Sequence, residues 1–151
     1  MITFRSISLP FLLVFCIETA IWINLSVPYF ADKPINFVGY LIISTVQLGA
    51  TVDYAILFTN SYLNNRKTMP GREAMKETIS NNLVAVITSA VILASAGFAL
   101  ALTSNNPIIN ELGILLGRGT LLSMTMVTFV LPALLVLFDK VIQKTSLKSE
   151  R

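Results

Sequence analysis

The chain has 151 residues, of which 54% are hydrophobic and 13% are charged, about half the charged share of an average soluble domain. It has no histidine and one cysteine, Cys16, which excludes a histidine-based metal site, a Ser-His-Asp triad and an internal disulfide. The net charge of +3 is compatible with nucleic-acid binding, but the basic residues border apolar runs. That placement indicates a membrane protein that binds no nucleic acid.

Four apolar stretches follow one another along the chain, at residues 7–27, 37–63, 83–102 and 112–138. Each has at least 20 residues, and about 20 residues of helix cross a hydrocarbon layer roughly 30 Å thick. The sequence therefore predicts an all-α, polytopic membrane protein with four transmembrane helices. They form a single transmembrane domain over residues 1–144.

The first stretch has a possible alternative interpretation as a signal peptide, because Arg5 precedes the apolar run. The run is longer than the apolar region of a signal peptide, Glu18 and Asn24 interrupt it, and no small-x-small cleavage site follows. A lipoprotein signal ending at Cys16 also fails, because bulky Phe15 stands where a small residue is expected. We therefore interpret this stretch as a membrane span.

Lysine and arginine predict the orientation. Nine of the eleven basic residues fall on one side if the spans alternate: Arg5, Arg66, Lys67, Arg72, Lys76, Lys140, Lys144, Lys148 and Arg151. Since basic residues favour the cytoplasmic side, we expect a multi-pass protein of the cell membrane with both termini in the cytoplasm. The connection at residues 64–82 is predicted to be a cytoplasmic amphipathic segment that leads into the third span, and residues 145–151 a basic cytoplasmic tail.

Two carboxyl groups lie within the predicted spans. Asp53 is ten residues from the cytoplasmic end of its span, a depth of about 15 Å, where an ionised side chain costs at least about 2.5–3.5 kcal/mol. A carboxyl group poised between charge and neutrality suits proton coupling, although a structural hydrogen bond to another helix is the alternative. Glu18 lies at nearly the same height and is a candidate for an accessory proton or polar path, to which Asn60 could also contribute. Arg118, six residues into the fourth span, is expected to reach outward to the interface.

Small residues in the spans predict positions of close helix packing, since they let backbones approach in lipid. Gly49 lies one turn before Asp53, and Gly113 and Gly117 form a G-x-x-x-G pair in the fourth span. A stripe in the third span consists of Ala90, Ala94, Gly97 and Ala101. Pro132 is expected to kink the fourth helix or to leave a carbonyl group that a neighbour satisfies.

Residues 49–58, with the sequence GATVDYAILF, resemble the G-x-x-x-D-Y-A segment of RND-superfamily transporters, in particular the MMPL-type branch. Residues 4–6 (FRS), 72–74 (REA) and 131–134 (LPAL) agree with it, and the resemblance extends over nearly the whole chain. It implies the last four helices of a transporter repeat and export of lipidic or amphipathic compounds driven by the proton gradient. By this resemblance Asp53 would carry the proton and Tyr54 would be its hydrogen-bonding partner, facing a matching pair on the other repeat.

Such a transporter has twelve helices in two repeats and large extracytoplasmic domains, whereas four spans are predicted here. The resemblance therefore implies a fragment, a split-gene product or a piece that assembles with a partner chain, inactive alone. Its expected partners are membrane lipids and the remaining transporter helices, or a chain that carries the opposite repeat. Oligomerisation and the substrate stay open.

Two other functions stay open. The first is a non-transporting membrane module, such as a sterol-sensing-like or scaffolding bundle that binds lipid or a partner protein. The second, a channel-forming oligomer, would need polar stripes on several spans, and the third span offers only Thr88, Ser89 and Ser95. An enzyme is not expected, because the sequence shows no nucleophile–base pair and no phosphate-binding loop. No metal or other cofactor is expected either.

Overall fold

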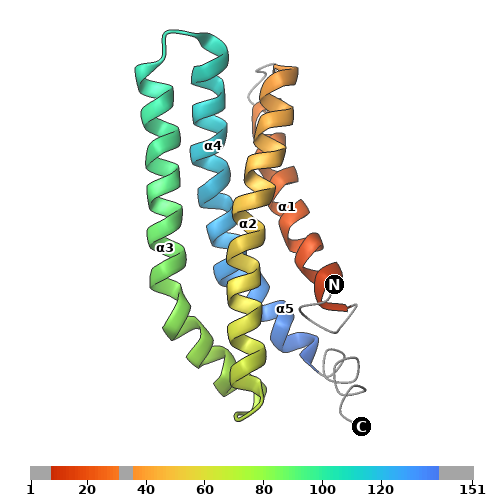
Figure 1. The fold of residues 1–151 in the computed structure, drawn as a ribbon. Coiled ribbons are helices and arrows are strands. Elements are labelled where there is room, and N and C mark those ends of the chain that lie inside the picture. The colour runs from red at the N-terminus through yellow and green to blue at the C-terminus, as the bar shows by residue number, and fades with distance from the viewer. Residues whose placement is uncertain (1–7, 31–35, 140–151) are drawn as a thin grey trace.

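The computed structural model describes residues 8–30 and 36–139, and within them the protein is helical apart from short connections. The helices are α1 (Ser8–Phe30), α2 (Phe37–Arg66), α3 (Gly71–Thr103), α4 (Pro107–Thr125) and α5 (Leu131–Leu137), with a π-helical turn, η1 (Met126–Val130), joining the last two (Figure 1). Four helical segments are long and apolar enough to cross a membrane: Leu9–Phe30, Gly39–Arg66, Gly71–Thr103 and Pro107–Leu137. The predicted all-α architecture with four candidate spans is confirmed.

The helices are longer than the apolar stretches that predicted them. α2 continues to Arg66 and α3 begins at Gly71, so most of the expected amphipathic segment at residues 64–82 is the first part of α3. Pro70, in an extended conformation, precedes the first residue of α3. Proline is tolerated at this position because it has no backbone N–H, and the N–H groups at the start of a helix have no partner within it. The expected tail at residues 145–151 lies outside the described residues.

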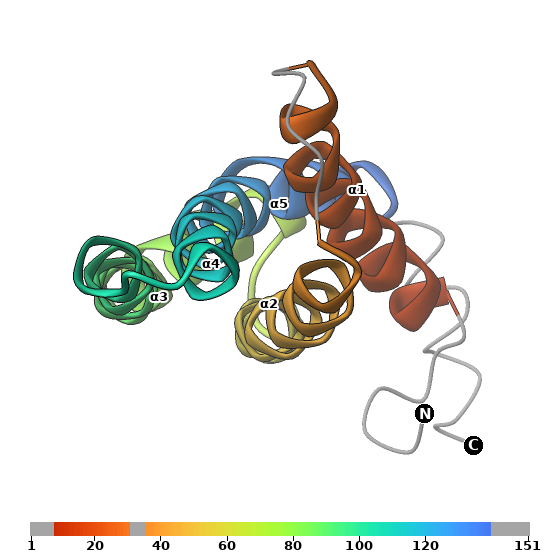
Figure 2. The same cartoon turned by 90° about the horizontal axis from the view of Figure 1, so that it is seen from above.

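The spans run up and down as a bundle (Figure 1). The start of α1, the connection between α2 and α3 and the end of α5 lie together at one end, which we call the basic end because Arg66, Lys67, Arg72 and Lys76 gather there. α4 contacts each of α1, α2 and α3, and the view along the bundle shows it beside α3 (Figure 2). α2 likewise contacts α1, α3 and α4, so these two helices form the centre of the bundle, with α1 and α3 on its flanks.

The interior differs between the two halves of the bundle. An apolar core nearer the basic end comprises Leu9, Leu13, Cys16, Ala55, Phe58, Tyr62, Ala74, Met75, Val86, Val127, Leu131 and Leu135. Towards the opposite end, α3 and α4 meet at backbone contact. A Cβ added to Gly113 would lie 2.5 Å from the backbone nitrogen of Ala101 and from the carbonyl oxygen of Gly97. Ala90, Ala94 and Gly117 are also buried.

The outer surface of the bundle is strongly apolar. Trp22, Val84, Leu102 and Phe129 are at least 70% exposed, and large apolar side chains are exposed on every span. In water so much apolar surface would drive aggregation, but in hydrocarbon it is the solvated face of the protein, while the helices satisfy the backbone hydrogen bonds internally. The surface therefore agrees with a membrane-embedded bundle.

Pro132 acts together with the π-helical turn that precedes it. The N–H of Leu131 donates to the carbonyl oxygen of Met126, five residues back, and Pro132 has no N–H to continue the ladder. The chain changes direction as α4 passes through η1 into α5 (Figure 1). The break in the backbone hydrogen-bond ladder expected at Pro132 is thus accompanied by a π-helical turn before it, and kinks at prolines and π-bulges are common.

Candidate functional site

α2 has two unlike faces, both of which carry polar residues. The inward face is buried and consists of Gln47, Thr51, Ala55, Phe58 and Tyr62. The outward face is exposed and consists of Thr45, Gly49, Asp53, Ile56 and Asn60. The residues of each set are three or four positions apart, so each set forms one stripe along the helix. The outward stripe contains the predicted proton carrier and Asn60, two turns nearer the basic end.

Asp53 lies on this outward stripe without a partner among the described residues. Its side chain is exposed and makes no hydrogen bond with any of residues 8–30 and 36–139. One turn earlier, a Cβ added to Gly49 would meet nothing within 4 Å. The described bundle therefore leaves this part of α2 uncovered.

Tyr54 points into the bundle instead. Its ring is half-buried and packs against the apolar core, because adjacent residues of a helix are about 100° apart around the axis. No hydrogen bond joins its hydroxyl to Asp53 in the described part of the chain. The two residues of the D-Y pair thus face different surroundings.

Glu18 is placed beside α2 but not against Asp53. It is exposed on α1 and lines a groove between α1 and α2 together with Trp22, Tyr29, Tyr40, Thr45 and Leu48. Asp53 does not line this groove. The two carboxyl groups therefore do not share a site in the described bundle, although their predicted depths are similar.

A buried polar network joins α1, α2 and α4, and its centre is Asn24. The side-chain amide of Asn24 donates to Gln47 Oε1 at 2.8 Å and to the carbonyl oxygen of Leu115 at 3.1 Å. Arg118 donates from Nε to Asn24 Oδ1 at 2.8 Å and from Nη2 to the Asn24 carbonyl oxygen at 2.9 Å. Arg118 is half-buried, and its guanidinium has a partner on α1 that its position in the sequence did not predict.

The network continues along the inward face of α2. Gln47 Nε2 donates to Ser123 Oγ at 3.2 Å, and Thr51 Oγ1 lies 2.7 Å from the same oxygen. Gly119 makes room for it, since an added Cβ would overlap the Asn24 amide and lie 2.6 Å from Gln47 Oε1. The sequence showed these polar residues inside apolar stretches, but not which of them meet.

A second polar cluster ties the helices together at the basic end. Asp139 accepts hydrogen bonds from Tyr62 Oη at 2.7 Å and from Arg66 Nε at 3.1 Å, and it forms an ion pair with Arg66 Nη2 at 3.1 Å. A Cβ on Gly71 would lie 3.2 Å from Asp139 Oδ2. The cluster thus joins the end of α2, the start of α3 and the residues after α5. No group of three or more candidate metal ligands occurs in residues 8–30 and 36–139.

Comparison with known proteins identifies the family. The model of the MMPL family matches residues 1–149, a region that contains the D-Y pair and both faces of α2. No curated protein and no solved structure matches the chain. Since the family model covers nearly every residue, the chain belongs to the MMPL family of the RND superfamily.

Proposed function

We propose that this chain forms the transmembrane portion of an exporter of lipidic or amphipathic compounds, driven by the proton-motive force, and that Asp53 takes up and releases the proton. The observation that carries the proposal is the uncovered position of Asp53 near the middle of a candidate span. An ionised carboxylate facing lipid there costs at least about 2.5–3.5 kcal/mol. We infer that helices from a partner chain or from another part of the same transporter cover this face in the working assembly.

The outward stripe of α2 supports this inference. The open space at Gly49 allows a helix backbone to approach closely, and Thr45 and Asn60 extend the polar surface on both sides of Asp53. Tyr54 is proposed to hydrogen-bond with Asp53 once the face is covered and the side chains rearrange. The basic end, with Arg66 and Arg72, is proposed to face the cytoplasm.

The inward face of α2 suggests how a proton could move more than one helix. Protonation of Asp53 removes a charge from the outward face and so changes the free energy of its contact with the covering helices. Gln47 and Thr51, on the inward face, connect α2 to α1 and α4 through Asn24 and Ser123. A displacement of α2 would therefore carry the two neighbouring helices with it.

The test replaces Asp53 in the complete assembly, reconstituted in vesicles with an imposed pH gradient. Asp53→Asn is expected to abolish gradient-dependent export, because an amide neither takes up nor releases a proton, while insertion in the membrane is unchanged. Glu73→Gln removes an exposed carboxylate at the basic end and should leave export intact. Export by Asp53→Asn at the rate of the unchanged protein would overturn the relay assignment.

A readout that needs no substrate accompanies the export assay. Dicyclohexylcarbodiimide reacts with protonated carboxyl groups in apolar surroundings, so it should label Asp53 more rapidly as the pH falls. The site is located by mass spectrometry, and Glu18→Gln serves as the matched variant that should keep the Asp53 label. Equal labelling at all pH values, with export indifferent to the gradient, would instead favour the non-transporting lipid- or protein-binding module.

A further inference from the structure

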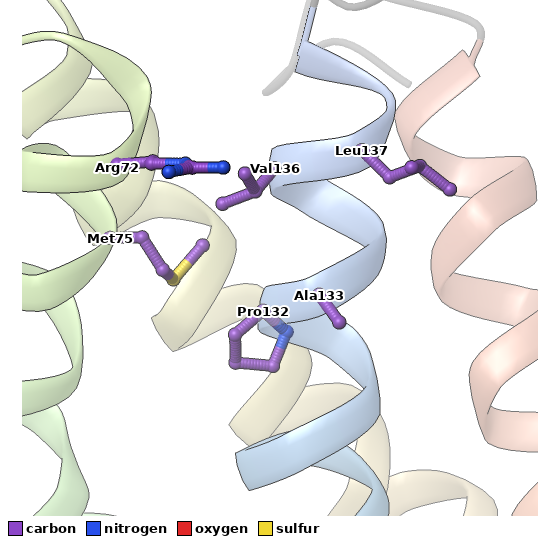
Figure 3. Close-up of a pocket in the computed structure, with 6 residues that line it drawn as sticks. All are labelled: Arg72, Met75, Pro132, Ala133, Val136 and Leu137. Carbon is purple, nitrogen blue, oxygen red and sulfur yellow. The ribbon is translucent and has the colours of Figure 1, made fainter.

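A groove at the basic end lies between α3 and α5, away from the proposed proton site. It is lined by Arg72 and Met75 of α3 and by Pro132, Ala133, Val136 and Leu137 of α5 (Figure 3). Ala133 and Leu137 are exposed, so the groove opens to the outside of the bundle. All the lining residues are apolar except Arg72, whose side chain extends towards Val136 (Figure 3).

The groove follows from how α3 packs along its length. At the far end its backbone touches α4 at Gly97 and Gly113. Nearer the basic end, η1 and Pro132 redirect the chain into α5, so α3 does not meet α5 through paired glycines as it meets α4. The space between them is a wedge with apolar walls, and it is open at the side that the membrane would contact.

Among the described residues Arg72 has no hydrogen-bonding or ion-pair partner, in contrast to Arg66. Arg66 is held by Asp139 through hydrogen bonds and an ion pair. Arg72 makes no hydrogen bond or ion pair with the described residues, although it extends over the apolar lining. Lys76, one turn further along α3, is also exposed, as are the carboxylates Glu73 and Glu77, so Arg72 is distinguished from its neighbours by its place in the lining of the groove.

We propose that this groove binds an anionic phospholipid of the leaflet at the basic end. Its phosphate would accept hydrogen bonds from the Arg72 guanidinium, and one acyl chain would lie against Met75, Pro132 and Val136. Basic pockets between membrane helices recognise anionic headgroups in this way. The inference goes beyond the proposed export and does not depend on Asp53.

The test measures lipid retained by the complete assembly in nanodiscs that contain phosphatidylglycerol and phosphatidylcholine, released gently and weighed by native mass spectrometry. Retention of phosphatidylglycerol should exceed that of phosphatidylcholine. Arg72→Gln should weaken it about fivefold, the effect of one interfacial basic residue, and Arg72→Lys should restore part of it. Ala133→Trp fills the groove from an exposed position and should abolish retention.

Two control variants distinguish binding in this groove from general effects of surface charge and of added side-chain size. Lys67→Gln removes an exposed cation of the same end outside the groove. Ala85→Trp adds the same bulk at an exposed alanine of α3 that does not line the groove. Both should retain phosphatidylglycerol like the unchanged protein. The proposal is overturned if phosphatidylcholine is retained equally, if Lys67→Gln weakens retention as much as Arg72→Gln, or if millimolar inorganic phosphate displaces the lipid completely.

Discussion

Replacing Gly113 by alanine is expected to separate α3 from α4. The added Cβ would lie 2.5 Å from the backbone nitrogen of Ala101 and the carbonyl oxygen of Gly97, whereas ordinary contact begins near 3.4 Å. The obstructing atoms belong to the backbone, so no side chain can rotate away. A gap of about 0.5–1 Å already forfeits a quarter to a half of the dispersion energy of each atom pair along the contact. Overpacking of this kind costs about 1–3 kcal/mol.

The chain carries its own probe for this loss of stability. Cys16 is the single cysteine of the sequence, its side chain is 1% exposed, and its thiol lies 3.9 Å from the carbonyl oxygen of Met126. A maleimide can therefore react only after the bundle opens. In micelles with a fixed fraction of denaturing detergent, a loss of about 1–3 kcal/mol should raise the labelling rate of Gly113→Ala about 5- to 150-fold.

Gly49→Ala is the matched control, because the same substitution there meets nothing within 4 Å. Cys16 of this variant should be labelled at the original rate or more slowly, since alanine is about 0.5–1 kcal/mol more favourable than glycine within a helix. Equal labelling rates for the Gly49 and Gly113 variants would show that α3 and α4 do not touch through their backbones.

Three further predictions concern the polar contacts and the uncovered face. Asn24→Leu removes the side-chain oxygen that accepts from Arg118 Nε and the amide that donates to buried Gln47, while the backbone carbonyl oxygen of residue 24 still accepts from Arg118 Nη2. The loss should cost about 1.5–3 kcal/mol, measured by cysteine labelling, and Asn24→Leu combined with Arg118→Met should recover part of it. Asp139→Asn should cost at most about 1 kcal/mol, since the ion pair with Arg66 is partly solvated, and added salt should reduce the difference between variant and original protein. Gly49→Leu should leave the labelling rate of this chain unchanged but should lower export by the complete assembly, whereas equal export would mean that no helix packs there.

The number and type of the elements could be predicted because the solvent dictates them. Hydrocarbon offers no hydrogen bonds to the backbone, so each apolar stretch of 20 residues must be helical. The start of α3 was harder to predict, since hydropathy changes near Leu83 while the helix already begins at Gly71. No glycine or proline interrupts residues 72–83, and the hydrogen-bonded ladder therefore continues through the change in polarity.

The polar contacts could not be predicted, because they depend on helix rotation. Depth follows from counting residues, and it placed Glu18 and Asp53 at similar heights. The structure places Glu18 in the groove beside α2, away from Asp53. Arg118 is the converse case, because its position six residues into the fourth span indicated only that its side chain could reach the interface. Its acceptor, Asn24, is 94 residues away along the chain, and no local pattern predicts that pairing.

The contrast between the two faces of α2 narrows the possible roles of Asp53. If the polar residues of this helix had no role, we would expect unpaired polar groups on both of its faces, with a similar free-energy cost for each. Instead the buried amide of Gln47 and hydroxyl of Thr51 are hydrogen-bonded to α1 and α4, and the costlier carboxyl group of Asp53 is left on the open side. Since an unpaired charge in hydrocarbon costs more than an unpaired amide, the open face needs either a covering helix or a proton. A proton on Asp53 changes only that face, while the connections on the other face stay intact. This asymmetry would let one titration alter how α2 meets its covering helices without loosening it from α1 and α4.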